Sequence, residues 1–99
     1  MDMIFNNIIG FEWDKGNLYK NFIKHKVTNG ECEELFFNIP LIIIDDKKHS
    51  QKEKRYAAFG ITEIGRKLTI VFTIRNKKIR IISARNMNKK ERDFYEEKK

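Results

Sequence analysis

The chain has 99 residues, of which 40% are hydrophobic and 35% charged, and this balance indicates a globular protein and argues against a disordered one. This length suffices for one modest hydrophobic core, so we expect a single domain covering residues 1–99. The net charge of +7 favours a polyanionic partner. A membrane is not the expected partner, because no apolar run could span a bilayer and no helix combines a strong apolar face with a basic one.

The single cysteine, Cys32, cannot close an intrachain disulfide, and nothing near the start resembles a signal peptide; both observations favour the cytoplasm. We expect no cofactor and no metal, since the sequence has no glycine-rich phosphate loop, nucleophile elbow or metal-ligand cluster. Asp45 and Asp46 could bind a metal, but adjacent carboxylates on a strand point to opposite faces, so a solvated turn is the better interpretation. His25 and His49 are too far apart in sequence to indicate a paired-imidazole mechanism.

The first half of the chain predicts one short strand and two helices. Alternation over residues 11–13 indicates a strand, and Asp14 is a suitable N-cap for a helix from residue 15 to about residue 25. Thr28 and Glu31 fit a capping box that opens a second helix, to about residue 38, before Pro40 ends it.

The second half changes to the two-residue period of strands. The strands are expected at residues 41–44, 55–62, 67–75 and 78–85. Asn88 and Glu91 form a further capping box, which predicts a last helix to about residue 97. The expected fold is therefore α+β, with two N-terminal helices packed on a mainly antiparallel sheet and a C-terminal helix.

Alternation within the strands predicts which side chains share a face. A two-residue turn at residues 76–77 would pair Arg75 with Lys78 and Thr73 with Arg80. A turn through residues 63–66 would pair Ile61 with Leu68 and set Tyr56 opposite Thr73. We therefore expect one face covered by helices and the other open, carrying a row formed by Tyr56, Thr73 and Arg80.

The charge distribution points to RNA on that open face. Residues 1–49 carry a net charge of −2 and residues 50–99 one of +9, and every arginine lies in the second half. A guanidinium suits phosphate oxygens, and a tyrosine ring can stack on a base, which are the two needs of a single-stranded RNA surface. An ordinary solvated face is the alternative, and it remains open.

A metal-free cleavage is possible, because the 2′-hydroxyl of RNA can attack the adjacent phosphate if a base removes its proton and cations stabilise the transition state. Arg80 and Arg75 are the candidates for the phosphate, while Arg92 and Tyr95 on the last helix could reach a sheet edge. No residue can be assigned as the general base.

Several of these residues also have structural explanations. Arg85 and Arg55 fall on the apolar parity of their strands, so we interpret Arg55 as structural and leave Arg85 open between RNA and a salt bridge with Glu91 or Glu53. Arg66 can be a solvated charge in a turn, Tyr95 can pack with Phe94, and Lys24 with His25 can simply complement a helix dipole.

Three groups of residues together resemble one known family. The groups are Phe11-Glu12-Trp13-Asp14 with Asn21 and Lys24-His25; Glu53 with Arg55-Tyr56, Gly60 and Gly65-Arg66; and Arg75 with Arg80-Ile81-Ile82-Ser83-Ala84-Arg85, Glu91-Arg92 and Tyr95-Glu96. In this order and spacing, over residues 11 to 97, they resemble the BrnT family of bacterial toxins.

The resemblance implies a RelE-like ribonuclease toxin that cleaves RNA and inhibits translation. It also implies a BrnA-like antitoxin partner with a ribbon-helix-helix DNA-binding part, in a heterotetramer that binds promoter DNA only through the antitoxin. Arg75, Arg80, Arg85, Arg92 and Tyr95 fall on the family's motif positions and inherit its active-site role. Lys24 and His25 also match, and with Tyr56, Thr73 and Lys78 they complete the expected RNA-binding set.

The chain departs from the family at both ends of the first helix. Asn17 stands where the family usually has lysine, and Lys26 stands where it has glycine. A glycine would suit a left-handed helix cap, so Lys26 implies strain or a different exit from the helix. Asn88 stands where the family tends to have alanine, and residues 1–10 precede the family's usual start.

Two other functions remain as alternatives. The chain could be a non-catalytic basic module that binds nucleic acid or an acidic antitoxin, or a subunit of a DNA repressor that acts only through its partner. A phosphate binder would lose affinity steeply with salt and similarly for every arginine removed.

Overall fold

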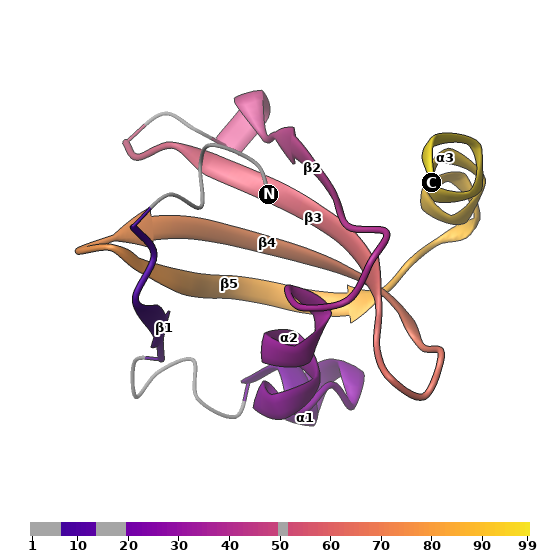
Figure 1. The fold of residues 1–99 in the computed structure, drawn as a ribbon, viewed down its shortest axis with the longest axis horizontal. Helices are drawn as coiled ribbons and strands as arrows, with labels where there is room; N and C mark the ends of the chain where they lie inside the picture. Colours follow the sequence, from indigo (N-terminus) through magenta and orange to yellow (C-terminus); the bar gives the residue numbers. More distant parts are fainter. Residues whose placement is uncertain (1–6, 14–19, 50–51) are drawn as a thin grey trace.

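A computed structural model describes residues 7–13, 20–49 and 52–99 of the chain. Its elements, in chain order, are β1 (Gly10–Glu12), α1 (Lys20–His25), α2 (Asn29–Leu35), β2 (Ile42–Asp45), the 3-10 helix η2 (Lys47–His49), β3 (Arg55–Ile61), β4 (Lys67–Arg75), β5 (Lys78–Asn86) and α3 (Lys89–Lys98). The strands form one sheet in the order β1-β5-β4-β3-β2, antiparallel except for the β1–β5 pair (Figure 1). The α+β class and the mainly antiparallel sheet are confirmed; the start of the first helix, with its expected cap at Asp14, lies outside the described residues.

The β4–β5 hairpin has the predicted register. Asn76 and Lys77 both have positive φ, as the two central residues of a type I′ turn require, and Arg75 pairs with Lys78. The predicted β3–β4 register is wrong by one residue, because Thr62 and Arg66 close a three-residue turn with Gly65 at φ 90°. Ile61 consequently pairs with Lys67, and Tyr56 pairs with Phe72 instead of Thr73.

A β-bulge interrupts β5. Phe72 pairs with Ile81, but its neighbour Val71 pairs with Ser83, so Ile82 is an extra residue in β5. Beyond the bulge the alternation of β5 is reversed. Arg85, predicted to share the apolar parity, therefore pairs with Thr69 and lies on the same face as Arg80.

Helices α1 and α2 lie against one face of the sheet, and the main core forms between them and the strands (Figure 1). The buried side chains of this core are Val27, Cys32, Leu35, Phe36, Ala58, Leu68, Ile70, Phe72, Ile79, Ile81 and Ala84. Gly60 lets α2 approach closely, because a Cβ there would lie 2.8 Å from Cγ of Leu35. The predicted capping box at Thr28 is confirmed, with Thr28 Oγ1 accepting from the Glu31 backbone N–H.

The opposite face is only partly open, which corrects the expectation of a bare face. Helix α3, whose predicted capping box at Asn88 is confirmed, lies over one end of this face. It forms a second small core in which Phe59 and Met87 pack with the buried Tyr95, and Phe94 contacts the Phe59 ring edge-on at 5.4 Å. The open part of the face therefore extends from α3 toward the β4–β5 turn.

Helix α1 ends in the αL capping motif, in which the N–H of the left-handed residue donates to the carbonyl four residues earlier. The backbone N–H of Lys26 donates to Phe22 O and that of Val27 to Asn21 O, and Lys26 has a left-handed φ of 59°. A lysine thus adopts the backbone conformation for which glycine is usual. Asn21 Oδ1 also accepts from the backbone N–H of Ala84 at 3.0 Å. Helix α1 thus supplies a hydrogen-bond acceptor to the edge of β5 beyond the point where β1 ends.

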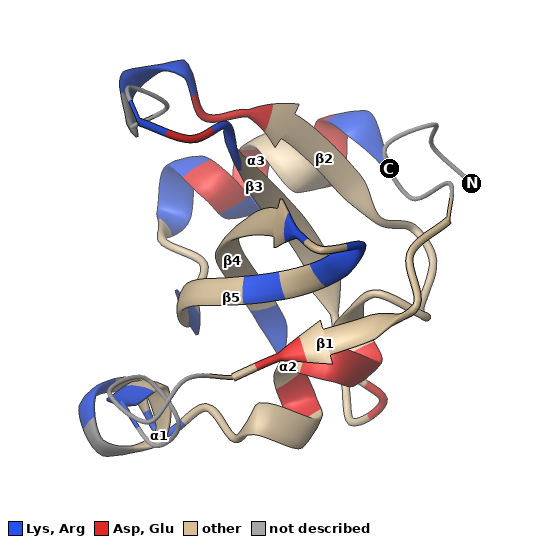
Figure 2. Ribbon diagram, turned by 90° about the vertical axis from the view of Figure 1, so that its left-hand side faces the viewer, with Lys and Arg blue, Asp and Glu red and all other residues tan. Residues whose placement is uncertain are grey.

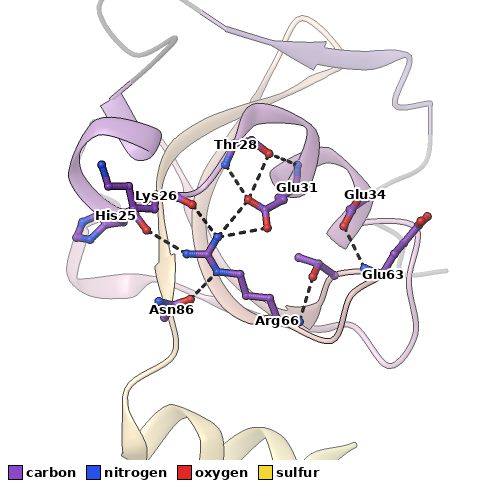
Figure 3. A network of polar contacts seen from close by, with 9 residues as sticks. His25, Lys26, Thr28, Glu31, Glu34, Glu63, Arg66 and Asn86 are labelled. Atoms are coloured by element: carbon purple, nitrogen blue, oxygen red, sulfur yellow. Dashed lines mark hydrogen bonds and ion pairs between the residues drawn. The ribbon is translucent and has the colours of Figure 1, made fainter.

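Arg66, expected to be a solvated charge, instead joins four segments of the chain (Figure 3). Its guanidinium donates to the carbonyl oxygens of His25 and Lys26, to the Glu31 carboxylate and to Asn86 Oδ1, at 2.7 to 3.3 Å. Two of these acceptors are carbonyl groups at the end of α1, where the helix itself supplies no N–H donor. A third, Glu31, belongs to the capping box of α2. The interpretation as a solvated charge is wrong.

Candidate nucleic-acid interface

The open face of the sheet contains a cavity of about 340 Å³ in front of α3. Its floor is an apolar strip from three strands, formed by Ala57, Phe59, Val71 and Ile82. Its polar lining consists of Asp46, Arg55, Thr69, Ser83, Arg85 and Glu91. The volume lies near the lower end of the range of small-molecule pockets, roughly 300 to 1,000 Å³, which suits a group of nucleotide size.

Arg85 is held at this cavity by a bidentate ion pair. Its two terminal nitrogens donate to the two carboxylate oxygens of Glu91, at 2.6 and 2.8 Å. Burial acts to raise the pKa of Glu91, but hydrogen bonds from Arg85 and the Asn88 N–H outweigh it, so this pKa is below its usual value. The same ion pair raises the pKa of Arg85. Arg85 is therefore held in one orientation at the cavity, with both terminal nitrogens engaged by Glu91.

Further cations follow the face toward the β4–β5 turn. Arg80 is half-buried near the start of β5, with Thr73 of β4 as one cross-strand neighbour and Glu12 of β1 as the other. Arg75 and Lys78 are exposed at the turn, where Arg75 Nη2 donates to Glu53 Oε2 at 2.9 Å. Figure 2 shows the Lys and Arg segments along β5 and around this turn, whereas α2 is mainly acidic. The predicted grouping of Arg75, Lys78 and Arg80 on one face is thus present, and the bulge brings Arg85, expected on the other face, to the same side.

Two members of the predicted row do not present polar groups on this face. Tyr56 lies on the opposite face, where its ring stacks on Phe72 at 5.3 Å. Thr73 is on the expected face but is 2% exposed, and its hydroxyl donates to Lys54 O at 2.7 Å. The predicted position of Tyr56 on the open face is wrong, because the β3–β4 register differs by one residue from the expected one, and the Thr73 hydroxyl is engaged in holding the start of β3.

The two residues predicted from α3 have different surroundings. Tyr95 is 1% exposed, its hydroxyl donates to Pro40 O at 2.5 Å, and burial raises its pKa. This places Tyr95 in the second core, as the alternative interpretation held, and corrects its expected position at a substrate. Arg92 is exposed, does not line the cavity, and donates to Met87 O at 2.9 Å.

Lys24 and His25 form the last turn of α1, beside the edge of β5. Lys24 is exposed, and the carbonyl of His25 accepts from Arg66. Neither residue lines the cavity. Their position suits the interpretation that cations complement the dipole of α1.

The sequence interpretation missed five polar residues of the cavity: Asp46, Arg55, Thr69, Ser83 and Glu91. Arg55 was assigned to the apolar parity, but the actual register pairs it with Thr73 and brings it to the open face. One signal was available for the bulge. The apolar positions of β5 change from odd numbers, Ile79 and Ile81, to an even one, Ala84.

Within the described residues, no three His, Cys, Asp or Glu side chains are grouped so that they could hold a metal ion. No helix in the described part of the chain is long and apolar enough to cross a membrane.

Fold and site together define a small α+β protein with a basic, partly covered sheet face. Residues 13–91 match the model of the family described as "Ribonuclease toxin, BrnT, of type II toxin-antitoxin system". The chain therefore belongs to the BrnT family of ribonuclease toxins, and the resemblance found in the sequence is confirmed. A search of curated proteins found no match.

Proposed function

We propose that this chain is a metal-independent endoribonuclease whose substrate binds in the cavity in front of α3 and along the arginines of β5. The observation that carries this proposal is the combination of an apolar floor with two arginines on one sheet face, Arg55 and the Arg85 held by Glu91. A base can lie against the floor formed by Val71 and Ile82, while Arg55 and Arg85 face the adjoining phosphate.

Arg80 supplies the electrostatic part of the chemistry. It is half-buried on the same face, where a cation interacts more strongly with developing negative charge than it would in water. The 2′-oxygen attacks the adjacent phosphorus, and the bond to the 5′-oxygen of the next nucleotide breaks. The products are a 2′,3′-cyclic phosphate and a 5′-hydroxyl, with the proton of the 2′-hydroxyl removed by a base and one returned to the leaving oxygen.

The biological consequence that we propose is inhibition of translation in the cytoplasm, relieved by a BrnA-like antitoxin. The complex would contain two toxins and two antitoxins, and it would reach promoter DNA only through the antitoxin. The family match supports an antitoxin partner, because a type II system pairs a toxin with a protein antitoxin. The other points are proposed from the resemblance.

The experiment incubates the purified chain with single-stranded RNA in EDTA and analyses the ends of the products. We expect cleavage with cyclic phosphate ends, and we expect Arg80→Ala to slow it by about 100-fold while RNA affinity falls modestly. A Lys98→Ala variant removes one positive charge from the far end of α3, outside the cavity, and is the control. RNA with 2′-deoxy sugars should be resistant.

Two results would count against the proposal. Cleavage that requires a divalent cation would refute the metal-free mechanism. Salt-sensitive RNA binding without cleavage, weakened equally by Arg80→Ala and Lys98→Ala, would identify a non-catalytic binding module.

A further inference from the structure

A second cavity, of about 310 Å³, lies on the other side of the molecule between β1 and the end of α2. It is lined almost entirely by apolar residues, namely Ile8, Ile9, Gly10, Phe11, Phe36, Phe37 and Ile79. We name it the β1–α2 groove. Its lining residue from β5, Ile79, points to the core face, so the groove does not share the face of the proposed RNA site.

Large hydrophobic side chains are unusually exposed here. Ile9 is 70% exposed and Phe37 is 77% exposed, and Ile39, two residues further along the chain, is 89% exposed. Single exposed apolar residues need no explanation, but two of them on the rim of one apolar groove indicate a binding surface.

Two further features limit what could bind. β1 is an edge strand, so within the described residues its outer row of backbone groups has no strand partner. Beside it, α2 carries Glu33, to which the structure gives no ion pair with a described cation, whereas the Glu34 carboxylate accepts from the backbone N–H of Glu63 in the β3–β4 turn. Glu33 is next to β1, since its carboxylate accepts from Trp13 Nε1 at 2.9 Å. Figure 2 shows this acidic helix beside β1 in a chain whose net charge is +7.

We infer that the β1–α2 groove is the docking site for an extended segment of the antitoxin, with apolar anchors that fill the groove and basic residues that face α2. An extended segment fits because β1 offers an open strand edge, where main-chain hydrogen bonds give affinity and side-chain pockets give selectivity. A basic flank fits because Glu33, next to β1, would repel an acidic segment at this position. A second copy of this chain is a poorer occupant, because two chains of net charge +7 repel each other.

This inference has a consequence for inhibition. Because the groove and the cavity of Arg85 lie on opposite faces of the sheet, a segment in the groove does not fill that cavity. The groove is thus an anchor, and antitoxin affinity depends on it even if the chain cleaves no RNA. The inference rests on the family's antitoxin partner and does not depend on the proposed ribonuclease activity.

The test measures binding of the purified cognate antitoxin to the purified chain by titration calorimetry. We expect Phe37→Asp and Ile9→Asp each to weaken binding by at least about tenfold, because each puts a charge in the apolar contact. The control is Ile64→Asp, the same kind of change at a side chain that is 84% exposed in the β3–β4 turn. Charge reversal of α2 with Glu33→Lys should also weaken binding, and circular dichroism should be unchanged for all of these variants.

Undiminished antitoxin binding by folded Phe37→Asp and Ile9→Asp would overturn the inference. So would an equal loss with Ile64→Asp, which would indicate a general effect of charge. If the wild-type chain alone is a dimer and Phe37→Asp is a monomer with full antitoxin affinity, the groove joins two copies of the chain, and the inference is again wrong.

Discussion

Removal of the Arg66 side chain should destabilise the protein more than removal of any exposed arginine. Arg66→Ala deletes hydrogen bonds to two carbonyls at the end of α1, to Glu31 and to Asn86. The side chains of Arg66 and Glu31 are 23% and 17% exposed, so the loss is smaller than the 3–5 kcal/mol or so typical of a fully buried pair. Hydrogen bonds to charged groups contribute about 1.5–3 kcal/mol, and we expect a loss of about 2–3 kcal/mol in the free energy of unfolding.

Urea unfolding, followed by the fluorescence of the single tryptophan, Trp13, measures this loss. With a denaturant slope of about 1–1.5 kcal/mol per M, the midpoint should fall by about 2 M. The matched control is Arg75→Ala, whose ion pair with Glu53 has partners 46% and 33% exposed and contributes at most about 1 kcal/mol. Arg66→Lys should be intermediate, since an ammonium cannot reach all four acceptors at once. Equal midpoints for Arg66→Ala and Arg75→Ala would refute this account of the network.

Three other predictions concern single residues. Lys26→Gly should raise the free energy of unfolding by about 0.5 kcal/mol in the same urea assay. Relief of the left-handed φ contributes about 1 kcal/mol, which exceeds the energy lost with the contact of Lys26 Nζ and the Phe22 ring. A loss of stability would contradict this. The pKa of Glu91 is lowered in the folded state, so its stabilising contribution is present above about pH 4.5 and is lost as the pH falls through its folded pKa. Glu91→Gln should therefore flatten the dependence of the urea midpoint on pH below 4.5, and an unchanged dependence would argue against the Arg85–Glu91 pair. Burial raises the pKa of the Cys32 thiol to about 12. A thiol reagent at pH 8 should therefore label Cys32 in urea but not in the native protein. Rapid labelling of the native protein would show that Cys32 is accessible.

Much of the fold could be predicted because its signals are local. The capping boxes at Thr28 and Asn88 need side chains at fixed spacing, and the type I′ turn at Asn76 fixes the register of the hairpin that follows it. The parallel contact of β1 with β5 could not be predicted in this way. It joins Phe11 to Ile79 across most of the chain, and no local pattern encodes that pairing.

The site was predicted less well than the fold, because one-residue errors reverse the faces of a strand. The β3–β4 turn contains three residues, whereas the sequence predicted a turn of four residues. This difference placed Tyr56 on the wrong face and removed Arg55 from the site. The unpredicted bulge at Ile82 likewise caused Arg85 to be assigned to the wrong face. Arg80 was placed correctly because it lies close to the well-defined turn at Asn76 and before the bulge.

The most direct test of the central claim is to induce this chain alone in bacteria and to follow growth and RNA integrity, beside Arg80→Ala produced at the same level. We predict growth arrest with fragmented RNA for the wild-type chain, and normal growth with intact RNA for Arg80→Ala. Intact RNA and normal growth with a folded wild-type chain would contradict the ribonuclease function, and equal fragmentation by both proteins would contradict the placement of the site on the arginine face of β5.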